Sequence, residues 1–449
     1  MIPREHTGLF WSGLIVWLCA MLYTLIIPSQ SDFQLLTIGF PLAIVTYILF
    51  ICSKPIGKKL QWLIIVGILV RLVSIFFFPQ LSDDIYRFIW DGRLAQNGMQ
   101  PYAYLPIDIV EQIPSLADGD ILSKMNSPEY YTVYPPVSQF VFYLGSWLGL
   151  SVEISSILMK SIFFISELAT LFFSLKILKW LKLSPSNILV YWLNPLIIIE
   201  GIGNLHFEII MIGFLSVSIY YWLTARHYRA IVFLAFSVGS KLLSLLILPY
   251  LLWQIRWKDS IIVLVLFIAV SLLIFSPLLV GLNYDEFLSS IDLYFRKFEF
   301  NAGFYYVLRW LGFQVTGYNL IAYIGPLLGL WFIIITLWIT IQEKVKNPIV
   351  FLYLVTLIYL LLSTTIHPWY LSIPLFCSIF IRSRVAVTWS CLIWLTYINY
   401  NEDVYFENLW IVGLEYIFLL VYILYEMKRT SALLVGEILS LNQSNSKAM

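Results

Sequence analysis

The sequence predicts an all-α polytopic membrane protein, and three observations support this fold class. Of its 449 residues, 60% are hydrophobic and only 12% are charged, whereas a soluble domain has about 45–50% apolar and about 25% charged residues. The mean hydropathy is +0.86. Long uncharged runs recur along the whole chain. No basic stripe has the density that nucleic-acid binding requires, so we expect a lipid bilayer and no nucleic acid as partner.

Each expected element is an apolar run that could cross a bilayer as a helix. Such a helix needs about 20 residues, and fewer where other parts of the protein shield it from lipid. The first run lacks a small-residue cleavage site, so we expect it to be a spanning helix and no removable signal. The four cysteines lie in apolar runs without metal-ligand spacing. We predict about 12–14 transmembrane helices from these candidate spans: 9–27, 33–52, 61–78, 154–178, 187–202, 207–224, 229–240, 241–255, 260–281, 318–341, 348–366, 368–382, 385–399 and 409–427.

The lysines and arginines of the short loops predict the orientation, because cytoplasmic loops are enriched in them. With a cytoplasmic N-terminus, all the basic clusters fall on the inner side, provided that residues 134–150 do not span. We therefore expect this segment to form a helix on the outer face that begins at Pro135-Pro136. The inner clusters are Lys54/Lys58/Lys59, Lys176/Lys179/Lys182, Arg226/Arg229, Arg256/Lys258, Lys344/Lys346, Arg382/Arg384 and Lys428/Arg429.

Two long segments then lie outside: 79–133, which with the surface helix makes an outer loop 79–153, and 282–317. The first contains SDDIYRFIWDGRLAQNGMQPYAY, residues 82–104. On a helix, Asp84, Arg87 and Asp91 would share one face. One interpretation is an N-cap followed by an ordinary exposed ion-pair stripe. The other is that Asp83 or Asp84, at the membrane boundary, accepts a proton from an alcohol; the pair could also bind a divalent cation such as Mg or Mn.

Further polar residues stand at the outer ends of the expected spans. His206 and Glu208 follow a glycine-rich junction, and His367 precedes another span; either histidine could simply be interfacial. Lys241 lies between two short apolar runs. A charge in hydrocarbon costs about 2.5–3.5 kcal/mol, so such a residue is a functional candidate by default. It could bind a lipid-linked phosphate, or it could snorkel to the interface.

Two other buried basic residues raise the same question. Arg71 lies near the end of the third span, and Lys160 could pair with Glu167 across the bundle. The second outer loop contains KFEFNAGFYYVLRW, in which Asn301 stands among tyrosines, a mixture that suits sugars. No glycine-rich phosphate loop is present, so a nucleotide-sugar donor has no evident site.

The run at 82–104 resembles the first outer loop of bacterial polyprenol-phosphate-mannose-dependent mannosyltransferases, which are integral-membrane glycosyltransferases of the GT-C superfold. Five further segments follow in the order of that family, and the resemblance extends from about residue 61 to 380. One departure is that relatives often read His-Asn-Asp where this chain has His206-Phe207-Glu208. The segments are TVYPPVSQFVF, NPLIIIEGIGNLHFEIIM, GSKLLSLLILPYLL, FNAGFYYVLR and HPWYLSIPL.

The resemblance implies a GT-C-like helical bundle with a long catalytic first outer loop. It implies transfer of a hexose, usually mannose, from a polyprenyl-phosphate donor to a glycolipid, glycan or protein hydroxyl on the extracytoplasmic face, with inversion. The acidic pair of the family maps onto Asp83, as general base, and Asp84. The candidates for binding the donor phosphate or sugar are Arg87, Asp91, His206, Glu208, Lys241, Asn301, His367 and Tyr370.

The expected organisation is an N-terminal transmembrane hairpin (1–60), a catalytic module (61–312), C-terminal transmembrane helices (313–429) and a short cytoplasmic tail (430–449). We expect a multi-pass protein of the cell (inner) membrane with both termini cytoplasmic. Two alternative functions stay open, a lipid-linked sugar transporter or flippase and a polysaccharide polymerase or ligase. Transporters bind near the midplane between structural repeats, and this sequence has no evident repeat.

Overall fold

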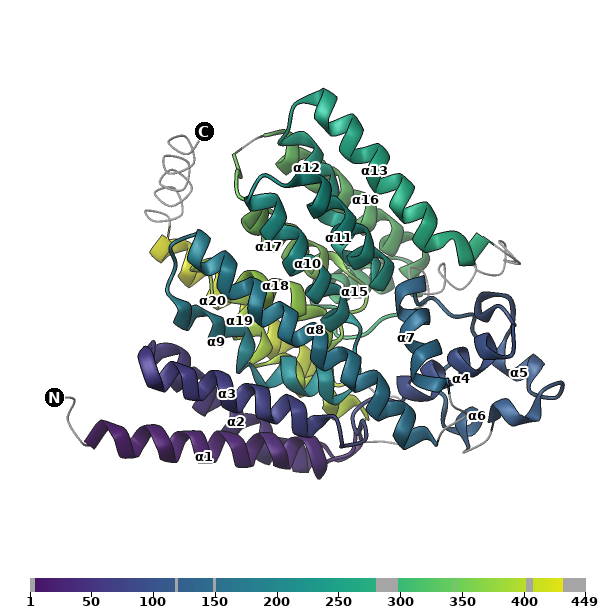
Figure 1. Ribbon diagram of the computed structural model, residues 1–449, viewed down its shortest axis with the longest axis horizontal. Coiled ribbons are helices and arrows are strands. Elements are labelled where there is room, and N and C mark those ends of the chain that lie inside the picture. Colours follow the sequence, from purple (N-terminus) through teal and green to yellow (C-terminus); the bar gives the residue numbers. More distant parts are fainter. Residues whose placement is uncertain are drawn as a thin grey trace.

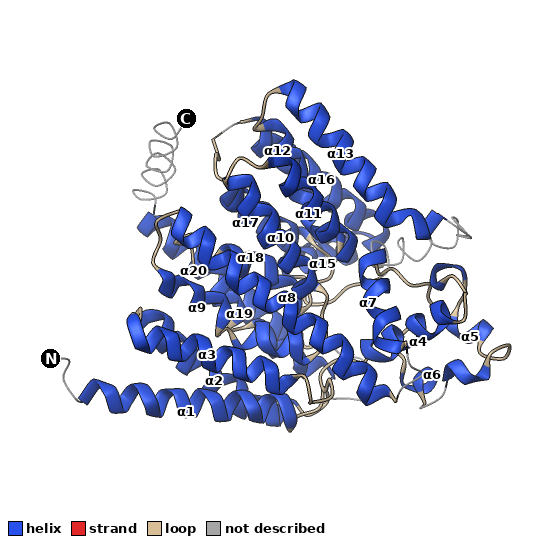
Figure 2. Ribbon diagram, in the orientation of Figure 1, coloured by secondary structure: helices blue, strands red, loops and turns tan. Residues whose placement is uncertain are grey.

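The computed structural model describes residues 5–117, 120–147, 151–279, 298–342, 344–400 and 407–430. Helices make up most of these residues (Figures 1 and 2). Their one β feature is an isolated bridge between Phe300 and Thr365. The start of α1 and the end of α20 lie at the left of Figure 1, and the short helices α4–α7 gather at the right. The predicted all-α polytopic fold is confirmed.

Six of the described helices are long and apolar enough to cross a membrane. One further span would be a broken one, in which residues 185–192 and 197–203 meet at a bend of 64°. Helix α3 (Gly57–Ser74) has 18 residues but contains Lys58, Lys59 and Arg71. The six are α1 (Glu5–Ile26), α2 (Phe33–Ser53), α8 (Val152–Trp180), α13 (Trp257–Phe275), α16 (Ile321–Ile341) and α20 (Leu409–Thr430).

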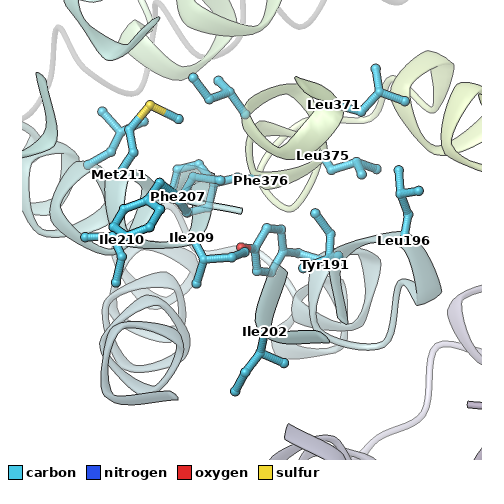
Figure 3. Close-up of a cluster of buried hydrophobic side chains, with 14 of the residues drawn as sticks. Tyr191, Leu196, Ile202, Phe207, Ile209, Ile210, Met211, Leu371, Leu375 and Phe376 are labelled. Carbon is cyan, nitrogen blue, oxygen red and sulfur yellow. The ribbon is translucent and has the colours of Figure 1, made fainter. Parts of the chain in front are cut away.

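The other expected spans are shorter helices, and several are broken into pieces. The reason is visible in α10 (Glu208–Leu223), which is buried around most of its surface between α8 and α11. A helix covered by protein need not reach across the hydrocarbon by itself. Figure 3 shows the apolar cluster into which Phe207, Ile209 and Met211 project. The short elements are η3 (Pro185–Ile188), α9 (Leu189–Trp192), η4 (Ile197–Gly203), α11 (His227–Ser240), η5 (Leu242–Ile247), α12 (Leu248–Trp253), η6 (Ser276–Leu279), α17 (Pro348–Leu362), η7 (Pro368–Leu371), α18 (Ser372–Cys377), α19 (Val385–Ser390) and η8 (Ile393–Tyr400).

The first outer loop is folded, as its apolar content predicted. Helix α7 (Pro136–Ser146) starts beside the proline pair and packs against α4. Its 11 residues extend about 16 Å, which is too short to cross a bilayer. Of the second outer loop, residues 282–297 lie outside the described residues. The elements of the two loops that are expected to lie outside are α4 (Asp84–Gln96), η1 (Pro101–Ala103), α5 (Pro106–Ile109), η2 (Pro114–Ala117), α6 (Ile121–Lys124), α7 and α15 (Gly303–Thr316).

A buried ion pair joins α3 to α8. Arg71 Nε lies 2.7 Å from Glu167 Oε2, and both side chains are shielded from solvent. The guanidinium also donates to the carbonyl oxygen of Trp192 at 2.8 Å and lies 3.8 Å from the centre of that ring. The expected pairing of Lys160 with Glu167 is therefore wrong. The two residues lie on the same helix about two turns apart, and Lys160 Nζ instead donates to the carbonyl of Phe77 at 2.6 Å.

Removing one partner of this pair should destabilise the bundle strongly. We expect Arg71→Met to lower the free energy of unfolding by about 3–5 kcal/mol, because Glu167 would stay buried without its counter-charge. The double variant Arg71→Met/Glu167→Leu should recover part of the loss. Unfolding of purified protein in detergent, followed by circular dichroism, measures both. Equal losses in the single and double variants would contradict this account.

Candidate active site

The acidic pair stands where the chain leaves the bundle and enters α4. Asp83 occupies the N-cap position, but its side chain makes no capping hydrogen bond and accepts none from the described residues. Asp84 is held in place, since its carboxylate accepts hydrogen bonds from Asn126 Nδ2 at 3.0 Å and from the Tyr134 hydroxyl at 3.1 Å. Partial burial, and then the negative charge of Asp84, raise the pKa of the Asp83 carboxyl above its usual range. One carboxylate is thus fixed, and its neighbour is free to meet a ligand.

Arg87 and Asp91 lie on the buried side of α4 and fasten the loop. Arg87 Nε donates to Asp91 Oδ1 at 2.8 Å, and Nη1 donates to the carbonyl oxygens of Ser127 and Tyr130 at 3.0 and 2.7 Å. The other Asp91 oxygen accepts from Gln139 of α7 at 2.8 Å. The ion pair expected at this spacing exists, but both side chains are buried. The interpretation as an ordinary ion-pair stripe expected them to be exposed. Its contacts hold neighbouring segments on α4, so a direct contact with phosphate stays a prediction.

A second polar centre forms where the broken helix turns into α10. Residue Leu205 has a positive φ of 62°, which lets the chain reverse between Gly203 and Glu208. The buried Glu208 carboxylate accepts a hydrogen bond from Lys241 Nζ, which projects from the end of α11. The Lys241 side chain keeps 28% of its surface exposed, and Nζ lies 5.3 Å from the centre of the Tyr370 ring. The ammonium is therefore held by a carboxylate and lies over an aromatic ring.

His206 and His367 are brought to this centre by aromatic packing. The His206 ring lies 3.6 Å from the Trp369 ring, measured between centroids. The His367 ring stacks on the Trp369 ring at 4.5 Å and on the Phe300 ring at 4.8 Å, again measured between centroids. Lys241 is close enough to interact electrostatically with both imidazoles. The motifs around 206, 241 and 367, far apart in the chain, thus meet at one place.

Asn301 lies beside this centre, but its side chain is engaged elsewhere. Phe300 pairs with the segment before His367 through backbone hydrogen bonds to Thr364 and Ile366 at 3.0 and 2.8 Å. Asn301, with φ of 48°, then turns its amide to Glu415 of α20, where Nδ2 donates to Oε1 at 3.2 Å. The structure therefore does not bring the Asn301 amide to Lys241, and a contact of Asn301 with sugar stays a prediction.

Direct contacts fix the acidic pair relative to the second centre. The backbone N–H of Leu81, two residues before Asp83, donates to Asn204 Oδ1 at 3.0 Å. The Ser138 hydroxyl of α7 donates to the carbonyl oxygen of Ser240, next to Lys241, at 2.7 Å. Asp84 is close enough to Glu208 to interact with it electrostatically. A carboxylate pair, a lysine and two histidines therefore share one region of the molecule.

Phe207 supplies the packing between the two centres. It is buried, and its ring makes edge contacts with Phe88 of α4, Phe142 of α7 and Phe163 of α8, at centroid distances of 5.4, 5.1 and 4.9 Å. Phe207, one of the two positions at which this chain departs from the expected His-Asn-Asp, is thus a core residue that joins α10 to the outer loop.

A family model described as alpha-(1->6)-mannopyranosyltransferase, N-terminal domain, matches residues 20–256. The chain belongs to this family. The match contains Asp83, Asp84, His206, Glu208 and Lys241 and ends before Asn301 and His367. It confirms the membership that the first outer loop indicated.

Two curated relatives of this mannopyranosyltransferase family are similar to the chain. Alpha-(1->6)-mannopyranosyltransferase A of Mycobacterium tuberculosis is 24% identical over 320 residues, covering 66% of this chain and 61% of the relative. The protein of the same name from Corynebacterium glutamicum is 23% identical over 186 residues, covering 40% of this chain and 36% of the relative. The chain therefore spans less than two thirds of either relative. No solved structure matches it.

Mg²⁺ takes six ligands in an octahedron and is usually held by one or two carboxylates together with water or phosphate oxygens. Both oxygens of the Asp84 carboxylate already accept hydrogen bonds. Among the residues that the structure describes, no group of three or more His, Cys, Asp or Glu side chains could hold a metal ion. We derive no step through a cation.

Several residues of this candidate site were not predicted from the sequence. Asn126 lies in none of the quoted motifs, and Tyr134 lies in TVYPPVSQFVF but was not singled out there; both reach Asp84 through the fold of the loop. Glu200 is different, since it interrupts the apolar run NPLIIIEGIG. An acidic residue inside a membrane segment is by itself a signal of function, so Glu200 could have been found.

We expect Phe207→Ala to lower the free energy of unfolding by about 3–5 kcal/mol, because it opens a cavity between α4, α7 and α10. Phe172→Ala, which shortens a side chain that is 54% exposed on α8, is the control and should change stability little. Thermal unfolding of the two variants in the same detergent gives the comparison. Similar midpoints for both variants would mean that Phe207 does not join the two centres.

Proposed function

We propose that this chain is a membrane mannosyltransferase that passes mannose from a polyprenyl-phosphate donor to an acceptor hydroxyl on the extracytoplasmic face. The observation that carries the proposal is the free Asp83 carboxylate beside a fixed Asp84, linked to a centre with a lysine and two histidines. Family membership and the names of the two relatives support mannose and an α-(1→6) linkage. The acceptor is a glycolipid, a glycan or a protein.

In the proposed reaction, Asp83 takes the proton from the acceptor hydroxyl. The hydroxyl oxygen forms a bond to the anomeric carbon as the bond from that carbon to the phosphate oxygen breaks, and the configuration inverts. General-base help of this kind contributes about 10²–10⁴-fold to a rate. Asp84, held by Asn126 and Tyr134, keeps the local charge that makes Asp83 more basic.

The polyprenyl phosphate leaves with one more negative charge than it carried as a phosphodiester. Lys241, His206 and His367 are the groups proposed to receive it, because preorganised donors stabilise charge that develops in the transition state. The hydrogen bond to Glu208 fixes the direction in which the Lys241 ammonium group points. Arg87 and Asp91 are proposed to hold the outer loop over the donor, while Asn301 and Tyr370 border the sugar. The sugar–phosphate bond supplies the energy, so no nucleotide is needed.

The proposed orientation has both termini in the cytoplasm and the acidic pair outside, in the cell membrane. The basic clusters of the short loops support it. With this orientation, residues 61–312 are the proposed catalytic module, between the hairpin 1–60 and the helices 313–429. A site at the membrane boundary lets a lipid carrier enter laterally from the bilayer.

We expect Asp83→Asn to abolish transfer while the protein stays folded. The amide keeps the shape of the side chain but cannot take a proton from the acceptor. Transfer of labelled mannose from polyprenyl-phosphate mannose to a mannoside acceptor, by purified protein in proteoliposomes, gives the rate. Asp108→Asn, at an exposed acidic residue of the same loop, is the matched control and should keep the wild-type rate. Near wild-type transfer by Asp83→Asn would refute the proposal.

The rate should also depend on pH in a defined direction. Because Asp83 acts as a carboxylate and its pKa is raised by partial burial and by Asp84, kcat/KM should fall as pH falls through that raised pKa. Asp84→Asn removes the neighbouring negative charge, so the acidic limb of the profile should move to lower pH, whatever happens to the maximum rate. A limb that stays in place, or moves to higher pH, would exclude Asp83 as the base.

A further inference from the structure

Glu200 is a buried acidic residue that the proposed mechanism does not use. It lies in η4, the π-helical half of the broken span, and is 1% exposed. Short π-helical turns are frequent at functional sites. A carboxylate at such a place must be paired, because leaving it unpaired in an apolar interior is costly.

The two oxygens of Glu200 face different partners, and the Asn204 side chain also interacts with the carboxylate. Oε1 accepts a hydrogen bond of 2.5 Å from the Tyr397 hydroxyl of η8. Oε2 lies 3.4 Å from His206 Nε2, and both of these atoms are buried without a hydrogen-bond partner. The backbone N–H of His206 also donates to the carbonyl oxygen of Glu200 at 3.2 Å, so the residues are held together by the backbone.

An unsatisfied donor and acceptor that face each other across 3.4 Å are poised to bond. Each buried polar group that is left without a hydrogen bond costs about 1–3 kcal/mol. An approach of about half an ångström gives an ordinary N–H···O distance. Catalytic hydrogen bonds are often long before substrate arrives and shorten in the complex. Trp369 covers the His206 ring, and Lys241, Glu208 and His367 are the other charged or titratable groups nearby.

We infer that Glu200 is a positioning residue for His206. It accepts a hydrogen bond from the Nε2–H group, which fixes the tautomer and turns Nδ1 toward the phosphate of the donor. Tyr397 holds Glu200 in this orientation. No bond is made or broken at His206. The inference rests on the proposed function for the identity of the ligand, but the Glu200–His206 contact can be tested without it.

The direct test is nuclear magnetic resonance of protein labelled with ¹⁵N-histidine, which the four histidines of the chain make tractable. His206→Gln assigns the signal. In the wild-type protein we expect His206 to carry its proton on Nε2. In Glu200→Gln the oxygen of the amide stays with Tyr397 and its NH₂ group faces Nε2, so the population with the proton on Nδ1 should rise. An unchanged His206 signal would overturn the inference.

Steady-state kinetics provide a second test of the role of Glu200. Glu200→Gln should lower kcat by about 10- to 100-fold, the range for loss of a group that orients a ligand, and change KM by less than about threefold. Tyr397→Phe keeps the carboxylate and should change kcat in the same direction by less, so the test survives if Glu200→Gln does not fold. Glu426→Gln and Tyr353→Phe remove polar groups that bond Arg384 and Ser383, and they are the matched controls.

The outcomes separate the two proposals. Wild-type kcat in Glu200→Gln, or a lower kcat with an unchanged His206 signal, would overturn the positioning role. If the wild-type protein transfers no mannose, the proposed function fails. The resonance experiment then still decides whether Glu200 fixes the His206 tautomer.

Discussion

The ion pair between Lys241 and Glu208 is the contact on which the arrangement of the candidate site depends. A charged side chain in hydrocarbon costs about 2.5–3.5 kcal/mol, and the buried Glu208 carboxylate, which is 1% exposed, likewise requires a partner of opposite charge. Glu208 is the first residue of α10, and the pair therefore binds the end of α11 to the turn that carries His206. The same constraint acts at Arg71 and Glu167, which join α3 to α8. Buried ion pairs therefore hold together helices that are separated in the sequence.

The position of the acidic pair depends indirectly on these buried ion pairs. Asp83 and Asp84 lie on a loop outside the bundle, and the hydrogen bonds of Leu81 and Ser138 attach this loop to the turn and to the end of α11. Phe207 fills the space between them. In the proposed reaction, the base and the groups that receive the phosphate must keep a fixed separation, and these contacts supply it. The C-terminal half contributes as well, because Tyr397 and His367 lie beyond the matched N-terminal domain.

The fold class, the folded outer loop and the short helix after the proline pair could be predicted from the sequence, because hydropathy, charge and turn chemistry act locally. The expected topology placed His206, Lys241 and His367 on one face, and the resemblance to a known family implied that they act together. The pairings could not be predicted. Glu167 was expected to pair with Lys160, and only the packing of α3 against α8 brings Arg71 to it. Asn301 is next to His367 through the backbone, yet its amide binds Glu415, a choice that depends on where α20 packs.

The central claim is that this centre transfers a sugar from a lipid phosphate to an acceptor hydroxyl. The most direct measurement uses wild-type protein in proteoliposomes with polyprenyl-phosphate mannose labelled with ¹³C at the anomeric carbon, and a mannoside acceptor. Magnetic resonance of the products reads the linkage and the configuration together. The account predicts a new α-(1→6) bond, inverted relative to the donor, with release of polyprenyl phosphate. Retention of configuration, or labelled donor that crosses the bilayer unchanged, would contradict it.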